Sequence, residues 1–202
     1  MRCWNQAELD QLDGDPALVP DDLLRKFARE VFDHFDEDEY ELAWRRFAPR
    51  IVGMLDHTPE SWLTQGLTWA GLSRWPENEQ IALRSLLTET VVRAAGDEER
   101  WPEVAELIWA AAQMDQDVTP WLRVIDDLPP VVVAELAREW SYDFLSGSGR
   151  SASSWDLWPE PGGPIREWLL TAALRARLSE MDGESAQWAV YQIDMLAEVS
   201  TR

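Results

Sequence analysis

The chain has 202 residues, of which 46% are hydrophobic, and a formal net charge of −20 at pH 7. A hydrophobic fraction of this size can form a packed core and excludes an intrinsically disordered chain, in which low hydrophobicity accompanies high charge. The excess of carboxylates repels the phosphates of a nucleic acid or an anionic membrane, so we expect neither as a partner, whereas a basic protein fits.

A cytoplasmic location is the simplest expectation from the cysteine content and the N-terminal sequence. Cys3 is the sole cysteine, so no intrachain disulfide can form. The first 20 residues are acidic and contain no continuous apolar run, unlike a signal peptide, and no later stretch reaches the roughly 18 apolar residues of a membrane span. Every basic residue except Lys26 is arginine, a bias typical of GC-rich bacterial genomes.

The first two helices are predicted after residue 20, and residues 1–18 are predicted to be a mobile N-terminal segment. Apolar residues recur at spacings of three and four, which indicates one buried face on each helix. The first face comprises Leu23, Leu24, Phe27, Val31, Phe32 and Phe35, and the second comprises Tyr40, Ala43, Trp44, Phe47, Ile51 and Leu55. The acidic run 36–39 between them suits a helix N-terminus, where the dipole is positive. Pro49 predicts a kink or a break in the second helix.

The tripeptide Trp-Pro-Glu occurs at residues 75–77, 101–103 and 158–160. Proline suits the first turn of a helix, and glutamate complements the helix dipole there. The first two copies therefore predict helix starts, with the tryptophan packing back over the helix that it introduces. The stretch before the first copy, from Thr58-Pro59 to about Arg74, is predicted to be one further helix. The third copy precedes Pro161-Gly162-Gly163-Pro164 and is interpreted as a loop feature or a coincidence.

The C-terminal part is predicted to hold helices over residues 130–144, 165–176 and 188–199, after a short segment that begins at Thr119-Pro120. The three valines at 131–133 suggest a strand, but the apolar spacing of three and four continues beyond them, so a helix is predicted. Residues 145–164 are rich in Gly, Ser and Pro and form a long predicted loop that carries Trp155 and Trp158.

The fold is predicted to be all-α, with about eight helices in a single domain spanning residues 1–202. Two helical hairpins begin alike, one from Thr58-Pro59 to Val92 and one from Thr119-Pro120 to Phe144. Over residues 38–145 this pattern resembles HEAT-type or armadillo-type repeats, whose units are paired helices of about 40 residues. The resemblance implies an α-α superhelix, a HEAT-like solenoid. The hairpins differ in length, so an irregular orthogonal helical bundle is the alternative.

The sequence assigns no catalytic, metal or cofactor-binding residue. His34 follows Glu30 by four residues, but a two-metal site needs a second such pair, which the sequence lacks. His57 suits a helix C-terminus, and Cys3 has no neighbouring histidine that would activate a catalytic thiol. The SGSGR stretch at 146–150 has neither the preceding strand nor the lysine of a phosphate-binding loop.

Candidate interaction residues are Trp155 and Trp158 in the long loop, and the acidic run Asp36, Glu37, Asp38 and Glu39. Tryptophans in such a loop either dock internally or form an interface, and the acidic run either binds a cation or is a solvated helix start. We expect a non-catalytic protein-interaction module, and a specific form of this expectation is an antagonist of a basic partner such as a nuclease. The alternatives are a carboxylate-based enzyme or helical accessory domain with an acidic pocket, and a homodimer formed through the tryptophan-bearing loop.

Overall fold

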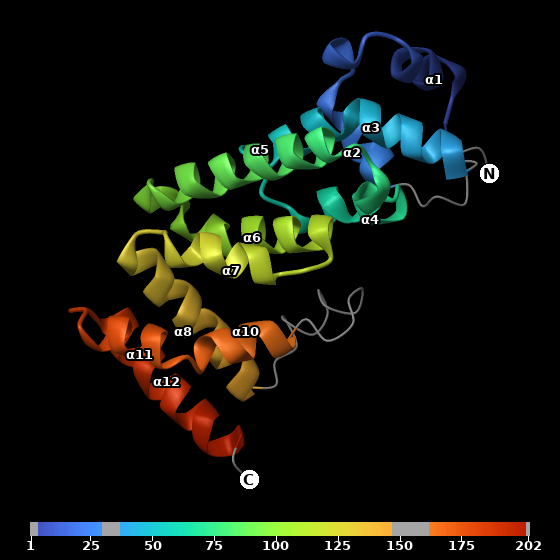
Figure 1. The fold of residues 1–202 in the computed structure, drawn as a ribbon. Helices are drawn as coiled ribbons and strands as arrows, with labels where there is room; N and C mark the ends of the chain where they lie inside the picture. The colour runs from blue at the N-terminus through green and yellow to red at the C-terminus, as the bar shows by residue number, and fades with distance from the viewer. Residues whose placement is uncertain (1–3, 30–36, 147–161, 201–202) are drawn as a thin grey trace. The chain divides into compact units, whose positions relative to one another are not determined.

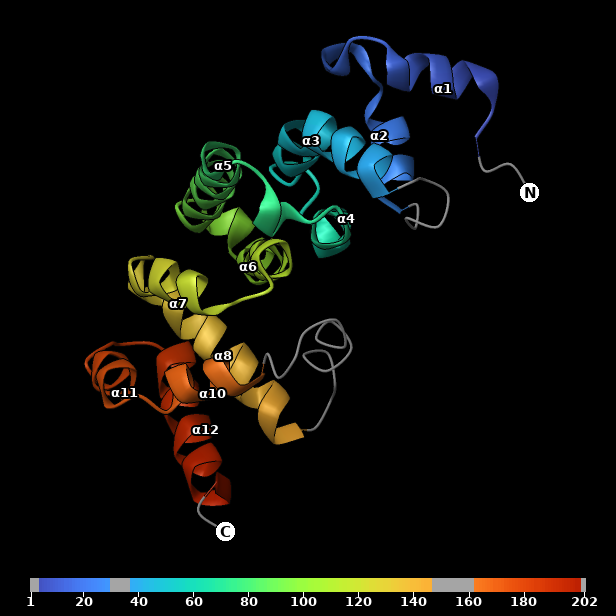
Figure 2. The ribbon, with the colours of Figure 1, turned by 45° about the vertical axis from the view of Figure 1, so that its right-hand side comes forward.

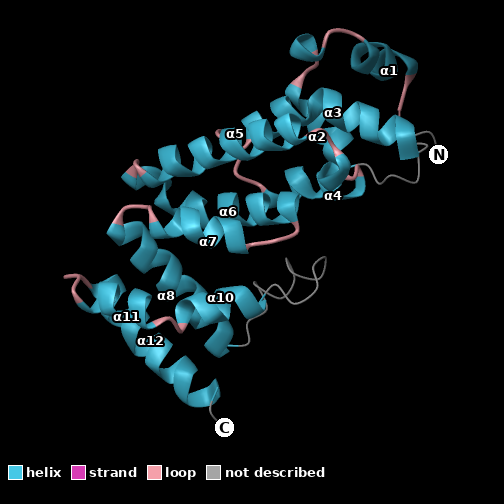
Figure 3. Cartoon of the chain, viewed as in Figure 1, coloured by secondary structure: helices cyan, strands magenta, loops and turns pink. Residues whose placement is uncertain are grey.

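The computed structural model describes residues 4–29, 37–146 and 162–200, and within these ranges it contains only helices and turns (Figure 1). The all-α prediction is confirmed for the described residues, which hold no strand (Figure 3). The α-helices are α1 (Gln6–Asp13), α2 (Asp21–Arg29), α3 (Glu37–Met54), α4 (Gln65–Trp69), α5 (Glu77–Ala95), α6 (Trp101–Asp115), α7 (Thr119–Asp126), α8 (Pro130–Ser146), α10 (Gly162–Leu169), α11 (Ala172–Ser179) and α12 (Glu184–Ser200). Four 3₁₀ segments join them, at Pro16–Leu18, Ser61–Thr64, Leu72–Arg74 and Glu98–Arg100.

The described residues hold eleven α-helices rather than the eight or so predicted, partly because α1 was not predicted and one predicted helix forms two. The stretch before Arg74 consists of α4 between two 3₁₀ segments, and Gly71, at φ 69°, adopts the left-handed conformation that ends a helix. The predicted helix 165–176 is split into α10 and α11 at Thr171. The hydroxyl oxygen of Thr171 accepts a hydrogen bond from the Leu174 N–H at 3.3 Å and so caps α11.

Helix α1 lies in the segment for which the sequence predicts mobility. Asn5 and Glu8 form a reciprocal capping box at its start. The Lys26 Nζ atom of α2 lies 2.8 Å from Glu8 Oε1 and 4.5 Å from the centre of the Trp4 ring. Because these contacts join α1 to α2, residues 4–13 belong to the folded structure.

The chain divides into two compact units, whereas the sequence predicts a single domain. The N-terminal unit comprises residues 1–91 and 106–115, and the C-terminal unit comprises residues 92–105 and 116–202. The boundaries fall within α5 and α6, where the helical pattern is continuous. A helical pattern read from the sequence therefore gives no sign of the division.

The core of the N-terminal unit is an aromatic cluster in which α2 packs against α3. The ring of Phe27 lies 5.3 Å from each of the rings of Trp44 and Phe47, and 6.5 Å from that of Tyr40. All four side chains are buried, as the helical spacing predicts. Val31, Phe32 and Phe35, predicted for the same face, lie outside the described residues.

Helix α3 continues through Pro49, so of the predicted kink or break, the break is wrong. Proline removes one backbone hydrogen bond, but buried side chains on both sides of it hold the helix in place. The neighbouring Arg50 also ties α3 to the preceding chain. Its Nη1 donates to the carbonyls of Pro16 at 2.7 Å and Val19 at 2.5 Å, and its Nη2 donates to Asp21 Oδ1 at 2.6 Å.

The first two Trp-Pro-Glu copies begin α5 and α6, as predicted. Each tryptophan also reaches back to the helical segment before it, a contact that the sequence did not suggest. Trp75 Nε1 donates to the carbonyl of Ala70 at 2.9 Å, and Trp101 Nε1 donates to that of Ala95 at 3.0 Å. Both copies thus end one helix and begin the next. The third copy lies outside the described residues.

The C-terminal unit is organised around α8 and α12, which lie side by side (Figure 2). The rings of Trp140 and Trp168 meet edge to face at 5.8 Å, and Trp168 Nε1 donates to Asp126 Oδ1 at 2.9 Å. Arg177 of α11 donates to the backbone carbonyls of Asp126 at 2.7 Å and Leu128 at 3.0 Å. The end of α7 is therefore held by side chains of α10 and α11.

Candidate binding groove

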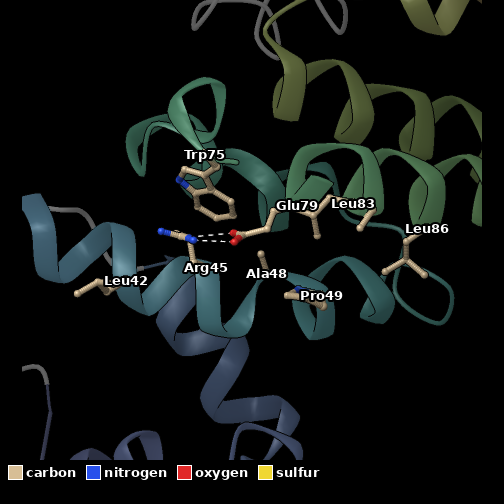
Figure 4. A pocket seen from close by; sticks show the side chains of 9 residues that line it. Leu42, Arg45, Ala48, Pro49, Trp75, Glu79, Leu83 and Leu86 are labelled. Carbon is tan, nitrogen blue, oxygen red and sulfur yellow. Dashed lines mark hydrogen bonds and ion pairs between the residues drawn. The ribbon is translucent and has the colours of Figure 1, made fainter. Parts of the chain in front are cut away.

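An open groove between α3 and α5 of the N-terminal unit encloses about 610 Å³ (Figure 4). Its lining consists of Leu42, Arg45, Ala48 and Pro49 from α3, Trp75 from the turn before α5, and Glu79, Ala82, Leu83 and Leu86 from α5. All of these side chains are apolar except Arg45 and Glu79. The floor is buried (Ala48, Trp75 and Leu83), while the rim is exposed (Leu42, Pro49 and Ala82).

The helical repeat explains why these residues share the groove. Leu42, Arg45 and Pro49 are spaced by three and four residues and therefore lie on one face of α3. The buried aromatic cluster occupies another face of the same helix. Leu42 is 64% exposed and adds an apolar side chain to the rim of this concave surface.

The polar part of the groove is a two-point ion pair between Arg45 and Glu79. Arg45 Nε donates to Glu79 Oε2 at 2.9 Å, and Arg45 Nη2 donates to Glu79 Oε1 at 2.6 Å. These bonds lower the pKa of Glu79 and raise that of Arg45. Because each charge is matched, the centre of the groove is close to neutral. Glu41 lies farther out, 3.9 Å from Arg45 and 4.0 Å from Arg74.

Trp75 presents an apolar wall to the groove because its polar atom is already used. Its indole N–H is bonded to the carbonyl of Ala70, and its own carbonyl accepts from Gln80 Nε2 at 2.8 Å. In Figure 4 the ring lies over the side of the groove where Arg45 and Glu79 meet. These bonds hold the indole in one orientation, so the wall is formed before any ligand binds.

Only part of the predicted acidic interaction run lies among the described side chains. Asp36 lies outside the described residues, and of Glu37 only the backbone is described, as the first residue of α3. Asp38 and Glu39 are exposed on the first turn of α3. Asp38 precedes Leu42 by four residues and so lies on the groove face, whereas the helical repeat places Glu39 on another side.

Trp155 and Trp158 lie outside the described residues, as do Cys3, His34 and most of the SGSGR stretch. His57 is exposed beyond the end of α3, where its backbone N–H donates to the backbone carbonyl of Met54 at 3.0 Å. Over residues 4–29, 37–146 and 162–200, no cluster of three or more His, Cys, Asp or Glu side chains could hold a metal ion. None of the helices in these ranges has both the length and the apolarity needed to cross a membrane.

The groove is not predicted by the sequence. A usable signal was present in Leu42 and Pro49, which are apolar but lie off the predicted buried face of α3. The participation of Trp75 and Glu79 depends on the packing of α5 beside α3, which no local pattern encodes. Comparison of the chain with models of known protein families gives no match, and neither curated protein sequences nor solved structures match it.

Proposed function

We propose that the protein is a non-catalytic interaction module whose α3/α5 groove holds a helix of a basic protein partner. The observation that carries this proposal is the preformed apolar groove with the exposed Leu42 on its rim. Exposed apolar surface next to a concavity is typical of binding sites. The proposal extends to a cytoplasmic bacterial protein that antagonises a basic enzyme such as a nuclease.

The dimensions of the groove suit side chains from one face of a helix. Ligand sites commonly enclose roughly 300–1,000 Å³, and a helix lying in a groove inserts apolar side chains spaced by three and four residues. Apolar side chains of both α3 and α5 line the groove, so the side chains of such a helix can contact both. The predicted HEAT-like superhelix belongs with this proposal, since solenoids bind partners on surfaces formed by successive helices.

Charge complementarity points to a basic partner. Arg45 and Glu79 neutralise each other, so the charge that a bound helix meets comes from the groove margin. Asp38 lies on the groove face of α3, about one turn before Leu42, and Glu41 lies within 4.0 Å of both Arg45 and Arg74 at the groove margin. Opposite charge on the partner is favoured there, and the net charge of −20 attracts a basic protein from a distance.

A carboxylate-based enzyme is less well supported by this site. Glu79 is the carboxylate in the groove lining, and Arg45 lowers its pKa, so it releases a proton more readily and accepts one less readily than an ordinary glutamate. A general acid or base working near neutral pH needs a raised carboxyl pKa instead. The mostly apolar lining fits binding better.

The test uses synthetic amphipathic peptides of about 18 residues, or five helical turns. Three versions share one leucine face and carry arginine, glutamine or glutamate at the flanking positions. Fluorescence polarisation measures their affinity for the full-length protein. We expect the arginine peptide to bind at least about tenfold more tightly than the glutamine peptide, and the glutamate peptide more weakly than either.

A matched pair of variants locates the binding. Leu42→Asp places a charge on the groove rim, and Leu18→Asp makes the same change at a residue that is 80% exposed outside the groove. We expect Leu42→Asp to lower the affinity for the arginine peptide by about tenfold or more, and Leu18→Asp to leave this affinity unchanged. Equal affinity for all three peptides, or equal effects of the two variants, would overturn the proposal.

A further inference from the structure

A second exposed apolar surface lies on the C-terminal unit, along α12 and the adjacent side of α8. Trp188, Tyr191, Met195 and Val199 are spaced by three and four residues along α12, and each is between 40% and 61% exposed. Tyr142 of α8 is 57% exposed. With roughly half of each side chain accessible, these five expose on the order of 400 Å², the size of the largest apolar patch on a typical monomer, which is often functional.

This stripe is separate from the face that anchors α12. The anchoring face consists of Ala186, Ala189, Ile193 and Leu196, all buried and spaced by three and four residues. By the helical repeat, Trp188 and Met195 lie more than a quarter-turn away from that face. The rings of Trp188 and Tyr191 support each other edge to face at 5.8 Å. The stripe is therefore an ordered surface in addition to the packed one.

A polar pocket of about 330 Å³ adjoins the stripe at Trp188. It is lined by Arg138, Glu184, Ser185, Trp188 and Gln192. Trp188 Nε1 donates to Glu184 Oε1 at 3.3 Å, which holds a carboxylate beside the indole. Arg138 is engaged by Glu135 at 2.7 Å, and the Ser185 hydroxyl also donates to Glu135. The pocket thus combines an aromatic wall with a carboxylate that Arg138 does not neutralise.

The charge of the two helices determines which occupant fits. Helix α12 carries Glu184, Asp194 and Glu198 and no basic residue, and α8 carries Glu135, Glu139 and Asp143 against Arg138. The two helices together therefore carry six carboxylates and one arginine, and Arg175 of α11 pairs with one of these carboxylates, Asp194, at 2.7 Å. A second copy of the chain would bring the same excess of negative charge, which disfavours self-association here.

We propose that the α8/α12 surface docks a basic amphipathic segment of a partner protein, with one arginine or lysine side chain seated in the polar pocket against Trp188 and Glu184. The cation lies against the indole face, where the ring quadrupole attracts it, and pairs with the carboxylate. Apolar side chains of the segment then cover Tyr191, Met195 and Tyr142. This surface belongs to a different unit from the α3/α5 groove, so the inference stands independently of the function proposed for that groove.

The experiment uses the full-length Leu42→Asp variant, in which the groove rim is charged, so that binding reports on the α8/α12 surface. The probe is the arginine peptide, and its control replaces every arginine with citrulline, which has nearly the same shape but no charge. We expect the arginine peptide to bind this variant with an affinity that falls as salt is raised. The citrulline peptide should bind at least about tenfold more weakly.

Variants of the surface then locate the contact. We expect Trp188→Ala and Glu184→Gln each to lower the affinity for the arginine peptide by about tenfold, because each removes one of the two groups that contact the cation. Glu180→Gln removes the same charge from an exposed residue outside the pocket and should have no effect. Circular dichroism of Trp188→Ala checks that the helical fold is retained when this half-exposed side chain is removed.

Four results would overturn the inference. The citrulline peptide could bind as tightly as the arginine peptide, or Glu180→Gln could weaken binding as much as Glu184→Gln. Alternatively, light scattering could show a dimer that Trp188→Ala converts to a monomer, which would assign the stripe to a second copy of the chain. Loss of binding by Leu42→Asp alone, with no effect of the α8/α12 variants, would leave the groove proposal intact and refute this one.

Discussion

Gly66 of α4 occupies a position where any larger residue would collide with the aromatic core. A Cβ atom at Gly66 would lie 2.1 Å from Trp44 Cζ2, 2.5 Å from Trp44 Cε2 and 2.9 Å from the Tyr40 hydroxyl oxygen. An ordinary contact begins near 3.4 Å, so the indole and α4 must separate by about 1.3 Å to admit a methyl group. Trp44 is fully buried, with Phe27 packed 5.3 Å from its ring, so it has no space to move into.

The size of the effect follows from two opposing contributions. Alanine in a helix is favoured over glycine by up to about 1 kcal/mol. Overpacking a rigid core destabilises by about 1–3 kcal/mol, and by more where rings and backbone must shift together. We therefore expect Gly66→Ala to lower the free energy of unfolding by about 2 kcal/mol or more.

Gly53→Ala is the matched control. Gly53 also lies in a helix, α3, and a Cβ atom there would meet no atom within 4 Å. Only the gain in helix propensity remains, so this variant should be more stable than the native protein by about 0.5–1 kcal/mol. Urea unfolding followed by circular dichroism measures both changes. The packing of α4 against Trp44 described here is wrong if Gly66→Ala is as stable as Gly53→Ala.

Three further predictions concern the N-terminal unit. Burial raises the pKa of Tyr40 to about 12. The neutral phenol therefore stabilises the fold fully below pH 10, and roughly 2–3 kcal/mol of this stability is lost as the pH rises towards 12. Unfolding measured at alkaline pH should show this loss in the native protein and not in Tyr40→Phe. Arg45→Gln should let the pKa of Glu79 rise towards 4.5, as measured by carbon-detected NMR titration, and an unchanged pKa would show that the ion pair does not form in solution. The buried hydroxyl of Thr64 donates to the carbonyl of Ala110 at 2.7 Å, so Thr64→Val should cost about 1–2 kcal/mol in urea unfolding, whereas no loss would mean that the carbonyl finds another donor.

Local patterns predicted the buried faces and several helix starts correctly because each depends on residues close in sequence. The spacing of Phe27, Trp44 and Phe47 indicated which sides of α2 and α3 are buried, and the prolines at 76 and 102 indicated where α5 and α6 begin. The breaks around α4 were missed because they follow from tertiary packing, which overrides a continuous apolar pattern.

The groove was missed for a related reason. Arg45 and Glu79 are 34 residues apart, and their pairing depends on how α5 lies beside α3. From the sequence each is an ordinary charged residue on a helix surface. Of the predicted acidic run, the helical repeat places Asp38 on the groove face. The apolar rim is visible in the sequence only as residues that fall outside the core pattern.

The most direct test of the binding function observes the groove wall itself. Trp75 lines the groove with its indole N–H bonded to Ala70, and the corresponding NMR signal of ¹⁵N-labelled protein can be assigned by its loss in Trp75→Phe. On titration with the arginine peptide, we predict that this signal shifts and that the affinity fitted to the shift equals the affinity measured by polarisation. Leu42→Asp should remove the shift. A Trp75 signal that stays in place while the peptide saturates the protein would contradict binding in the α3/α5 groove.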